Sequence, residues 1–199
     1  MVLKSTKLKF RGDFEVIAFK NPEDWNGWLS EHHSISNGIW IRLFKKDSGM
    51  KSLTHDGALD EALCYGWIDG QAKKYDEKSW IQKFTPRRAG SIWSKRNINR
   101  VEALIKAGRM KASGLEEINE AKKDGRWEKA YDSPSNMKIP GDFLKELSKD
   151  KKALKFFKSL NKTNKYAIVW RLQTAKKSET RSNRMNKILD MLSKGEKFY

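Results

Sequence analysis

The pattern of hydrophobic and polar positions changes character about halfway along the chain. In the first half, short apolar runs alternate with segments of helical spacing. The β-branched and aromatic residues 14–19 predict a first strand, and the alternation in residues 39–44 predicts a second. Residues 67–68 and 79–84 predict two more strands. We therefore expect the order β-α-β-α-β-β, which gives a small mixed β-sheet packed by helices on one face.

Two helices are expected between these strands. Asn21 is a good cap for a helix that starts with Pro22, and Trp25 and Leu29 recur at helical spacing behind it. Thr54 caps a second helix, which Gly66 ends. Both helices have an apolar side, so we expect them to pack on the sheet.

From residue 91 onward the pattern is helical throughout. Ser91 or Ser94 can cap a helix that ends near Gly108, and residues 113–116 fit a capping box for the helix that follows. The apolar stripes predicted for these two helices contain Ile98, Val101 and Ile105, and then Leu115, Ile118 and Ala121.

Residues 132–136 break the helical pattern and are the best linker candidate. Short helices are expected beyond them at residues 140–147, 151–160, 164–174 and 179–192. The fold class is therefore α+β. We expect an α+β core domain over residues 1–135 and a helical C-terminal module over residues 136–199, packed on the core domain or tethered to it.

The charge is strongly positive and unevenly distributed. The formal net charge is +17, and the segment from residue 138 onward has 17 basic and 6 acidic residues. A basic ridge on a helix is typical of a protein that binds nucleic acid or an anionic surface. Lys greatly outnumbers Arg, so an ordinary solvated surface stays open as the alternative. The basic-surface candidates are Lys176, Lys177, Arg181, Arg184 and Lys187.

Several classes of protein are disfavoured. The single cysteine, Cys64, excludes an internal disulfide, and the three histidines have no zinc-ligand spacing. No apolar run approaches the roughly 18 residues that a membrane-spanning helix needs. Residues 1–10 lack the features of a secretory signal. We expect a cytoplasmic protein with no transmembrane segment, no metal and no cofactor.

One segment has the composition of an anion-binding site. Arg87 and Arg88 follow a proline and precede an expected helix start, where the first backbone amides are unpaired donors. Ser91 and Ser94 add hydroxyl groups. Together these groups would cradle a phosphate, sulfate or carboxylate. The alternative is a capped helix whose arginines pair with acids such as Asp69.

Asp69 and two tryptophans are candidates for the same corner. Asp69 could act as a general base, orient the arginines, or simply cap a turn or form a salt bridge. Trp67 and Trp93 would offer flat apolar surface beside the cations, although most tryptophans should belong to the core. No nucleophile–base pair accompanies them, and Cys64 fits a small core residue better than a nucleophile. We therefore name no catalytic residue and favour a protein that is not an enzyme.

Several strings resemble the bacteriocin-protection family, also called YdeI/OmpD-associated. The resemblance extends over nearly the whole chain from Phe10, and the strings that carry it are residues 58–70, 84–95, 100–110, 124–127, 166–171 and 174–184. It implies association with bacteriocin protection and stress tolerance in bacteria, and it implies no known reaction and no catalytic residue. The family often has Tyr where this chain has His55.

Three functional classes stay open. The first is a cytoplasmic protection or stress protein that acts by binding an anionic ligand or partner. The second is a non-sequence-specific binder of nucleic acid or of an anionic surface. The third is an uncharacterised enzyme or sensor for a small phosphorylated or acidic ligand. The sequence does not predict the oligomeric state.

Overall fold

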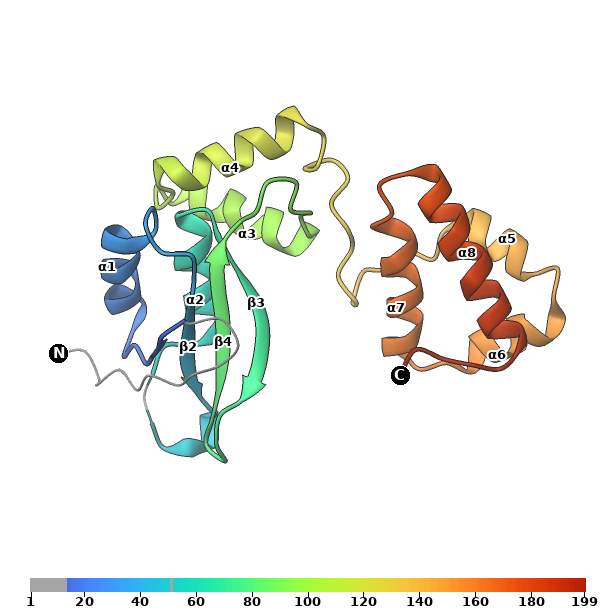
Figure 1. The fold of residues 1–199 in the computed structure, drawn as a ribbon, viewed down its shortest axis with the longest axis horizontal. Helices are drawn as coiled ribbons and strands as arrows, with labels where there is room; N and C mark the ends of the chain where they lie inside the picture. The colour runs from blue at the N-terminus through green and yellow to red at the C-terminus, as the bar shows by residue number, and fades with distance from the viewer. Residues whose placement is uncertain (1–13, 51) are drawn as a thin grey trace. The chain divides into compact units, whose positions relative to one another are not determined.

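The computed structural model describes residues 14–50 and 52–199 (Figure 1). The expectation that residues 1–10 lack a secretory signal concerns residues outside this part. Contacts divide the chain into two compact units. The sheet unit is Met1–Ser91 with Asn99–Glu128, and the helical unit is Ile92–Ile98 with Lys129–Tyr199. The expected division near residue 135 stays a prediction.

The sheet unit contains the expected small mixed sheet. Its strands are β1 (Val16–Ile17), β2 (Ile39–Phe44), β3 (Trp67–Lys74) and β4 (Ser79–Pro86), and they lie in the order β1-β2-β4-β3. The pair β1–β2 is parallel, and the other two pairs are antiparallel. Helices lie between these strands and after them in the chain, so the α+β class predicted from the sequence is confirmed.

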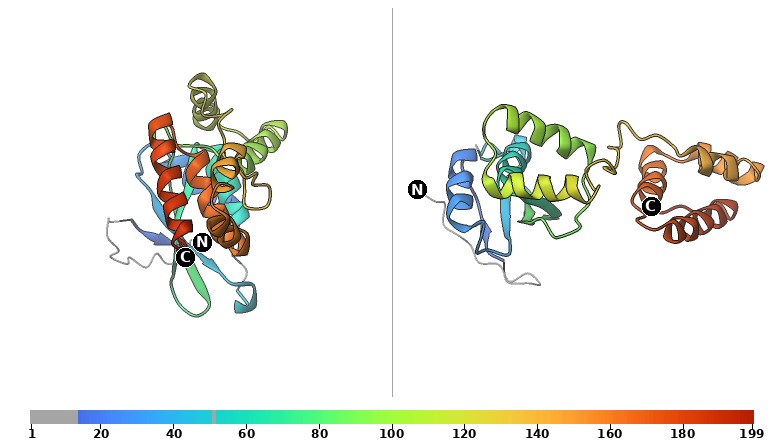
Figure 2. Two further views of the ribbon diagram at one scale, coloured as in Figure 1. Left: turned by 90° about the vertical axis from the view of Figure 1, so that its right-hand side faces the viewer. Right: turned by 90° about the horizontal axis from the view of Figure 1, so that it is seen from above.

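The helices α1 (Pro22–His32) and α2 (His55–Cys64), drawn in blue and in teal in Figure 2, have the predicted caps. The side chain of Asn21 accepts from the Asp24 amide at 2.8 Å, and that of Thr54 accepts from the Gly57 amide at 3.1 Å. Trp25 in α1 is fully buried, and its Nε1 donates to the Ala58 carbonyl in α2 at 3.0 Å. The two helices are therefore fastened to each other within the apolar core.

Strand β3 is longer than the two-residue strand that the sequence predicted. It runs to Lys74 as a mostly exposed edge strand, so it lacks the apolar alternation by which a strand is recognised. Its register with β4 shifts between Asp69 and Ala72. The buried Gln82 side chain donates to the carbonyl of Gly70 at 2.9 Å and thereby satisfies the backbone at this bulge.

The next two helices are α3 (Lys95–Lys106), which contributes to both units, and α4 (Ala112–Lys123). Ser94 caps α3, because its Oγ accepts from the Asn97 amide at 3.1 Å. The prediction of a capping box at residues 113–116 was wrong, because α4 begins directly after Lys111. The Ser113 hydroxyl instead donates to the Tyr65 carbonyl at 3.1 Å.

The predicted apolar stripes of α3 and α4 were partly wrong. Ile105 is 41% exposed and Leu115 is 39% exposed. Val101, Ile118 and Ala121 are buried as expected.

The helical unit has four further helices, α5 (Gly141–Leu147), α6 (Lys151–Ser159), α7 (Lys162–Gln173) and α8 (Ser178–Ser193). Their bounds agree closely with the sequence prediction. Their shared core is apolar and contains Phe143, Leu147, Ala153, Phe157, Leu160, Ile168, Leu172, Ile188 and Leu192. The unit therefore has a hydrophobic core of its own, separate from that around the sheet.

Candidate functional site

The two arginines of the predicted anion corner differ in their surroundings. The backbone amide of Arg87 donates to the Gly66 carbonyl at 3.0 Å, just beyond the paired ends of β3 and β4. Its side chain is only 6% exposed and lies near the carboxylate of Glu117. Burial raises the pKa of Glu117, while the charges of Arg87 and Arg126 act in the opposite direction. Arg88 is exposed. The positive charge of Arg87 therefore acts on a protein carboxylate.

Asp69 lies beside a different side chain from the one expected. Its Oδ2 is 3.2 Å from Nε2 of His55, and both side chains are about one-third exposed, at 29% and 32%. The strand register explains this contact, because Asp69 is opposite Phe84 whereas Arg87 pairs with Gly66. Sequence reasoning did not connect His55 with Asp69, because they come from different elements, α2 and β3.

The other candidates of the corner are mostly structural. Trp67 is 1% exposed, and its Nε1 donates to the His33 carbonyl at 3.1 Å. The Ser91 carbonyl accepts from Nη1 of Arg126 at 2.9 Å. Trp93, at 2% exposure, and the cap residue Ser94 belong to the helical unit. Within the sheet unit, the described contacts do not bring Asp69 together with the arginines.

A pocket of about 300 Å³ lies in the helical unit. It combines an apolar floor with cationic groups, and its lining residues are Trp170, Arg171, Arg184, Lys187, Ile188 and Phe198. We call it the cationic pocket. Apolar and aromatic linings with a few well-placed polar groups are typical of ligand sites, and this volume is at the lower end of their usual range.

Helical spacing and a pinned segment together build the cationic pocket. Arg184, Lys187 and Ile188 are three and four residues apart on α8, so they share one side of that helix. The segment after α8 is held by Asn164, which is 2% exposed. Its Oδ1 accepts from the Tyr199 amide at 3.0 Å, and its Nδ2 donates to the Tyr199 carbonyl at 3.1 Å. These two bonds fix the neighbouring Phe198 as one wall.

The arginines of the pocket are oriented by groups that leave their charge intact. The guanidinium of Arg171 lies 3.8 Å from the centre of the Phe198 ring, and its Nη1 donates to the Ala167 carbonyl at 3.0 Å. Nη1 of Arg184 donates to the Arg171 carbonyl at 2.8 Å. A carbonyl carries no net charge, so both arginines keep a positive charge that an anion can use.

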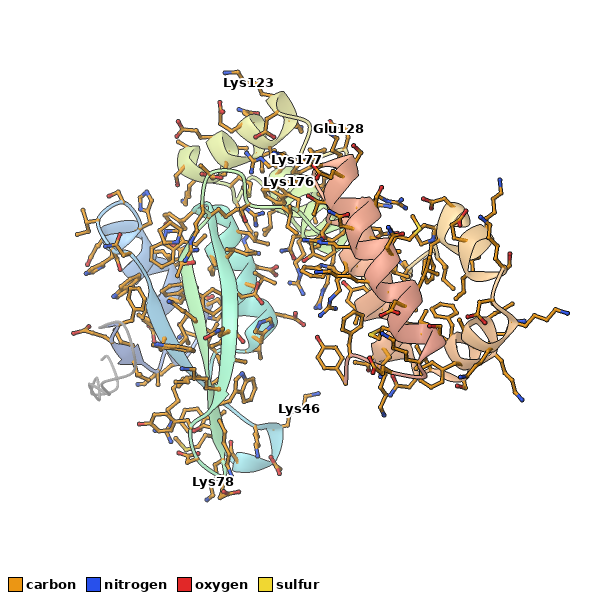
Figure 3. All side chains as sticks on the ribbon, turned by 45° about the vertical axis from the view of Figure 1, so that its right-hand side comes forward. Lys46, Lys78, Lys123, Glu128, Lys176 and Lys177 are labelled. Atoms are coloured by element: carbon orange, nitrogen blue, oxygen red, sulfur yellow. The ribbon has the colours of Figure 1, made fainter. Side chains whose placement is uncertain are left out.

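The predicted basic ridge is divided by these contacts. Arg181 forms two hydrogen bonds with Asp142, at 2.5 and 2.9 Å, and is thereby paired with an acid. Arg184 and Lys187 line the cationic pocket. Lys176 and Lys177 lie at the N-terminal end of α8 (Figure 3). The five candidates therefore do not act as one uniform stripe.

Sequence reasoning missed three members of the pocket: Trp170, Arg171 and Phe198. Trp170 and Arg171 were assigned only to a family-like string, and Phe198 follows the last predicted helix. A usable signal was the adjacent tryptophan and arginine near the end of α7, facing a helix rich in basic residues. The contact with Phe198 depends on the Asn164–Tyr199 bonds, which no local pattern reveals.

Comparison with known families gives two separate matches, one in the first part of the chain and one in the last part. Residues 136–195 match the family described as "Bacteriocin-protection, YdeI or OmpD-Associated". The resemblance seen in the sequence is thereby confirmed for the C-terminal part, and this match does not extend to the strings before residue 136. The chain thus combines an α+β domain with a C-terminal module of this type.

The larger match gives the family of the chain. Residues 17–117, half of the sequence, match a family described as "Domain of unknown function (DUF8412)", and the chain belongs to this family. Comparisons with curated proteins and with solved structures found no match. Among the residues that the structure describes, no helix is long and apolar enough to cross a membrane.

Proposed function

We propose that this is a cytoplasmic bacterial protein of bacteriocin protection or stress tolerance, and that it acts by binding an anionic ligand. The family description of residues 136–195 supports the protective role. The observation that carries the binding role is the cationic pocket, in which Arg171, Arg184 and Lys187 surround an apolar floor. No nucleophile–base pair was found in the sequence, so we favour binding over catalysis.

The chemistry of the pocket favours an amphipathic anion. Trp170, Ile188 and Phe198 offer apolar surface, which gains from contact with a hydrocarbon or aromatic group. The guanidinium and ammonium groups favour a carboxylate, sulfonate or phosphate on the same molecule. A ligand with both parts uses the whole lining, whereas an inorganic anion uses only the cations.

The test is calorimetric titration of the full chain with naphthalene-2-sulfonate, with the uncharged naphthalene-2-sulfonamide as the control ligand. We expect the sulfonate to bind at least about tenfold more tightly, because it adds charge-assisted hydrogen bonds. Lys187→Gln should weaken sulfonate binding several-fold, since Lys187 lines the pocket. Lys155→Gln is the matched control, because it removes the same charge from an exposed position on α6.

Equal binding of the two ligands, or equal losses in the two lysine variants, would contradict the proposed site. The alternative function, sequence-independent binding of nucleic acid or an anionic surface, is supported by the net charge of +17. Single-stranded DNA in the same titration distinguishes it. Tight, strongly salt-dependent DNA binding that Lys187→Gln and Lys155→Gln weaken equally would favour the alternative.

A further inference from the structure

A second cavity, of about 370 Å³, lies in the sheet unit. It is lined by α1, by α2 and by the connection between α3 and α4, through Glu23, Asn26, Glu61, Gly108, Arg109 and Lys111. The cationic pocket has an apolar floor, but this cavity is lined almost entirely by polar and charged side chains. Two of them are acids and two are bases, so the lining as a whole is electrically balanced.

Its inner wall is a buried and ordered set of polar groups. Glu61 is 6% exposed. One of its carboxylate oxygens, Oε2, accepts from Nδ2 of Asn26 at 2.6 Å, and the other accepts from Nη2 of Arg109. The hydroxyl of Tyr65 donates to Oδ1 of Asn26 at 3.3 Å. These bonds hold Asn26 and Arg109 in fixed orientations before any ligand arrives, which lowers the entropy lost on binding.

Its outer edge has one exposed charge of each sign, and the ammonium of Lys111 lies 5.9 Å from the centre of the Tyr65 ring. Glu23 is exposed in the first turn of α1, and Lys111 is exposed directly before α4. Among the described contacts, neither residue has an ion-pair partner. Lys111 gives α4 no side-chain cap, so the first amides of α4 strengthen the positive potential on that side. Glu23 makes the opposite side negative.

We propose that this cavity binds a small zwitterion that has an ammonium and a carboxylate on one short backbone, as a free α-amino acid does. The ammonium lies against Glu23 and the carboxylate against Lys111, while the Asn26 amide and the Arg109–Glu61 pair form the wall between them. A ligand with one charge would leave part of this lining without a partner, which costs binding free energy. The site is distinct from the cationic pocket in residues and in chemistry, and it goes beyond the proposed function.

The test is a calorimetric screen of the twenty common amino acids against the full chain, up to about 10 mM. The tightest binder is then compared with its N-acetyl and its carboxamide derivatives. We expect at least one amino acid to bind, and each derivative to bind at least about tenfold more weakly, because each lacks one charged contact. No binding by any amino acid, or equal binding of the derivatives, would overturn the proposal.

Two exposed variants assign the contacts without disturbing the buried wall. Glu23→Gln should remove most of the discrimination against the N-acetyl derivative, and Lys111→Gln should remove most of that against the carboxamide. Glu31→Gln, on the same helix α1 but outside the cavity, should change neither. Lys187→Gln should leave amino-acid binding intact, so failure here is distinguishable from failure of the cationic pocket. Discrimination unchanged in Glu23→Gln and Lys111→Gln would also overturn the site.

Discussion

The arginines of the two units have different partners. In the sheet unit, carboxylates pair with arginines that hold elements together, namely Arg42 with Asp76, Arg100 with Asp56 and Asp60, and Arg109 with Glu61. Arg126 pairs locally with Asp124, two residues before it. In the helical unit, Arg181 pairs with Asp142, whereas Arg171 and Arg184 donate to backbone carbonyls. Within the described residues, the uncompensated guanidinium charge around a pocket belongs to the helical unit.

This difference shows why net charge alone does not locate a binding site. A guanidinium paired with a carboxylate is already neutralised, and its ion pair contributes mainly to holding elements together. A guanidinium oriented by carbonyls and by an aromatic ring keeps its charge and has a fixed direction. The contacts of each arginine, more than the number of basic residues, therefore point to the cationic pocket.

The largest effect should come from breaking the close packing of the sheet unit at Gly114. A Cβ added there would lie 2.3 Å from the Cys64 carbonyl oxygen, so α2 and α4 would have to move apart. We expect Gly114→Ala to lower the free energy of unfolding by about 3 kcal/mol, as severe overpacking does. Urea unfolding followed by tryptophan fluorescence measures this loss.

Gly27→Ala is the matched control, since nothing lies within 4 Å of the added Cβ. It lies within α1 and should stabilise the protein slightly, by about 0.5 kcal/mol. Equal stability of the two variants would mean that α2 and α4 do not approach each other so closely.

The next effect is a slow reaction of the Cys64 thiol, which is buried in the sheet unit. Burial, followed by the negative charge of Glu61, raises the pKa of Cys64 to about 11 from the usual 9.0. At pH 8 the thiolate should therefore be about 100-fold scarcer than in the unfolded chain, and labelling by a disulfide reagent should slow by at least that factor. The rate should rise with pH toward 11. Labelling as fast as in concentrated urea would contradict this environment.

A smaller effect is expected in the helical unit, at the residue that holds the C-terminal segment. Asn164→Ala removes both hydrogen bonds to Tyr199 and shortens a side chain that is only 2% exposed. We expect a loss of about 2 kcal/mol of stability. Binding of naphthalene-2-sulfonate should also weaken, because Phe198 is no longer fixed. Asn186→Ala, at an exposed position of α8, should change neither quantity.

The smallest effect should be that of the paired arginine of the helical unit. Arg181→Gln removes an ion pair whose side chains are 30% and 52% exposed, so we expect a loss of at most about 0.5 kcal/mol. The hydrogen bonds from Arg181 lower the pKa of Asp142 from its usual 3.8. The contribution of the pair is therefore present at neutral pH and is lost as the pH falls through the folded-state pKa, below 3.8.

Acid titration of stability in Arg181→Gln and in the unmodified protein measures this contribution. The gap between the two curves should close in strong acid. A gap that instead widened on acidification would mean that the pKa of Asp142 is raised by folding.

Much of the fold was predictable because local signals were strong. The caps Asn21 and Thr54 and the alternation in β2 gave helices and strands close to their observed bounds. The length of β3 was not predictable, because an exposed edge strand has no apolar alternation. The Ser113 hydroxyl satisfies a carbonyl from a distant segment, so its capping-box pattern was misleading.

The candidate site was harder to predict, because it depends on contacts between distant residues. Arg184 and Lys187 were among the basic-surface candidates predicted from the sequence, and they line the cationic pocket. The choice of His55 as the neighbour of Asp69 depends on strand register, and the burial of Arg87 depends on tertiary packing. Composition shows which residues can bind an anion, but tertiary contacts determine which of them remain available.

The most direct test of this contrast is an NMR titration of the full, isotopically labelled chain with naphthalene-2-sulfonate. We expect the side-chain resonances of Arg171 and Arg184 and the indole resonance of Trp170 to shift together and to saturate. The side-chain resonances of Arg42 and Arg100, which are paired with acids, should stay in place. Shifts centred on those paired arginines, or spread evenly over the surface, would contradict binding in the cationic pocket.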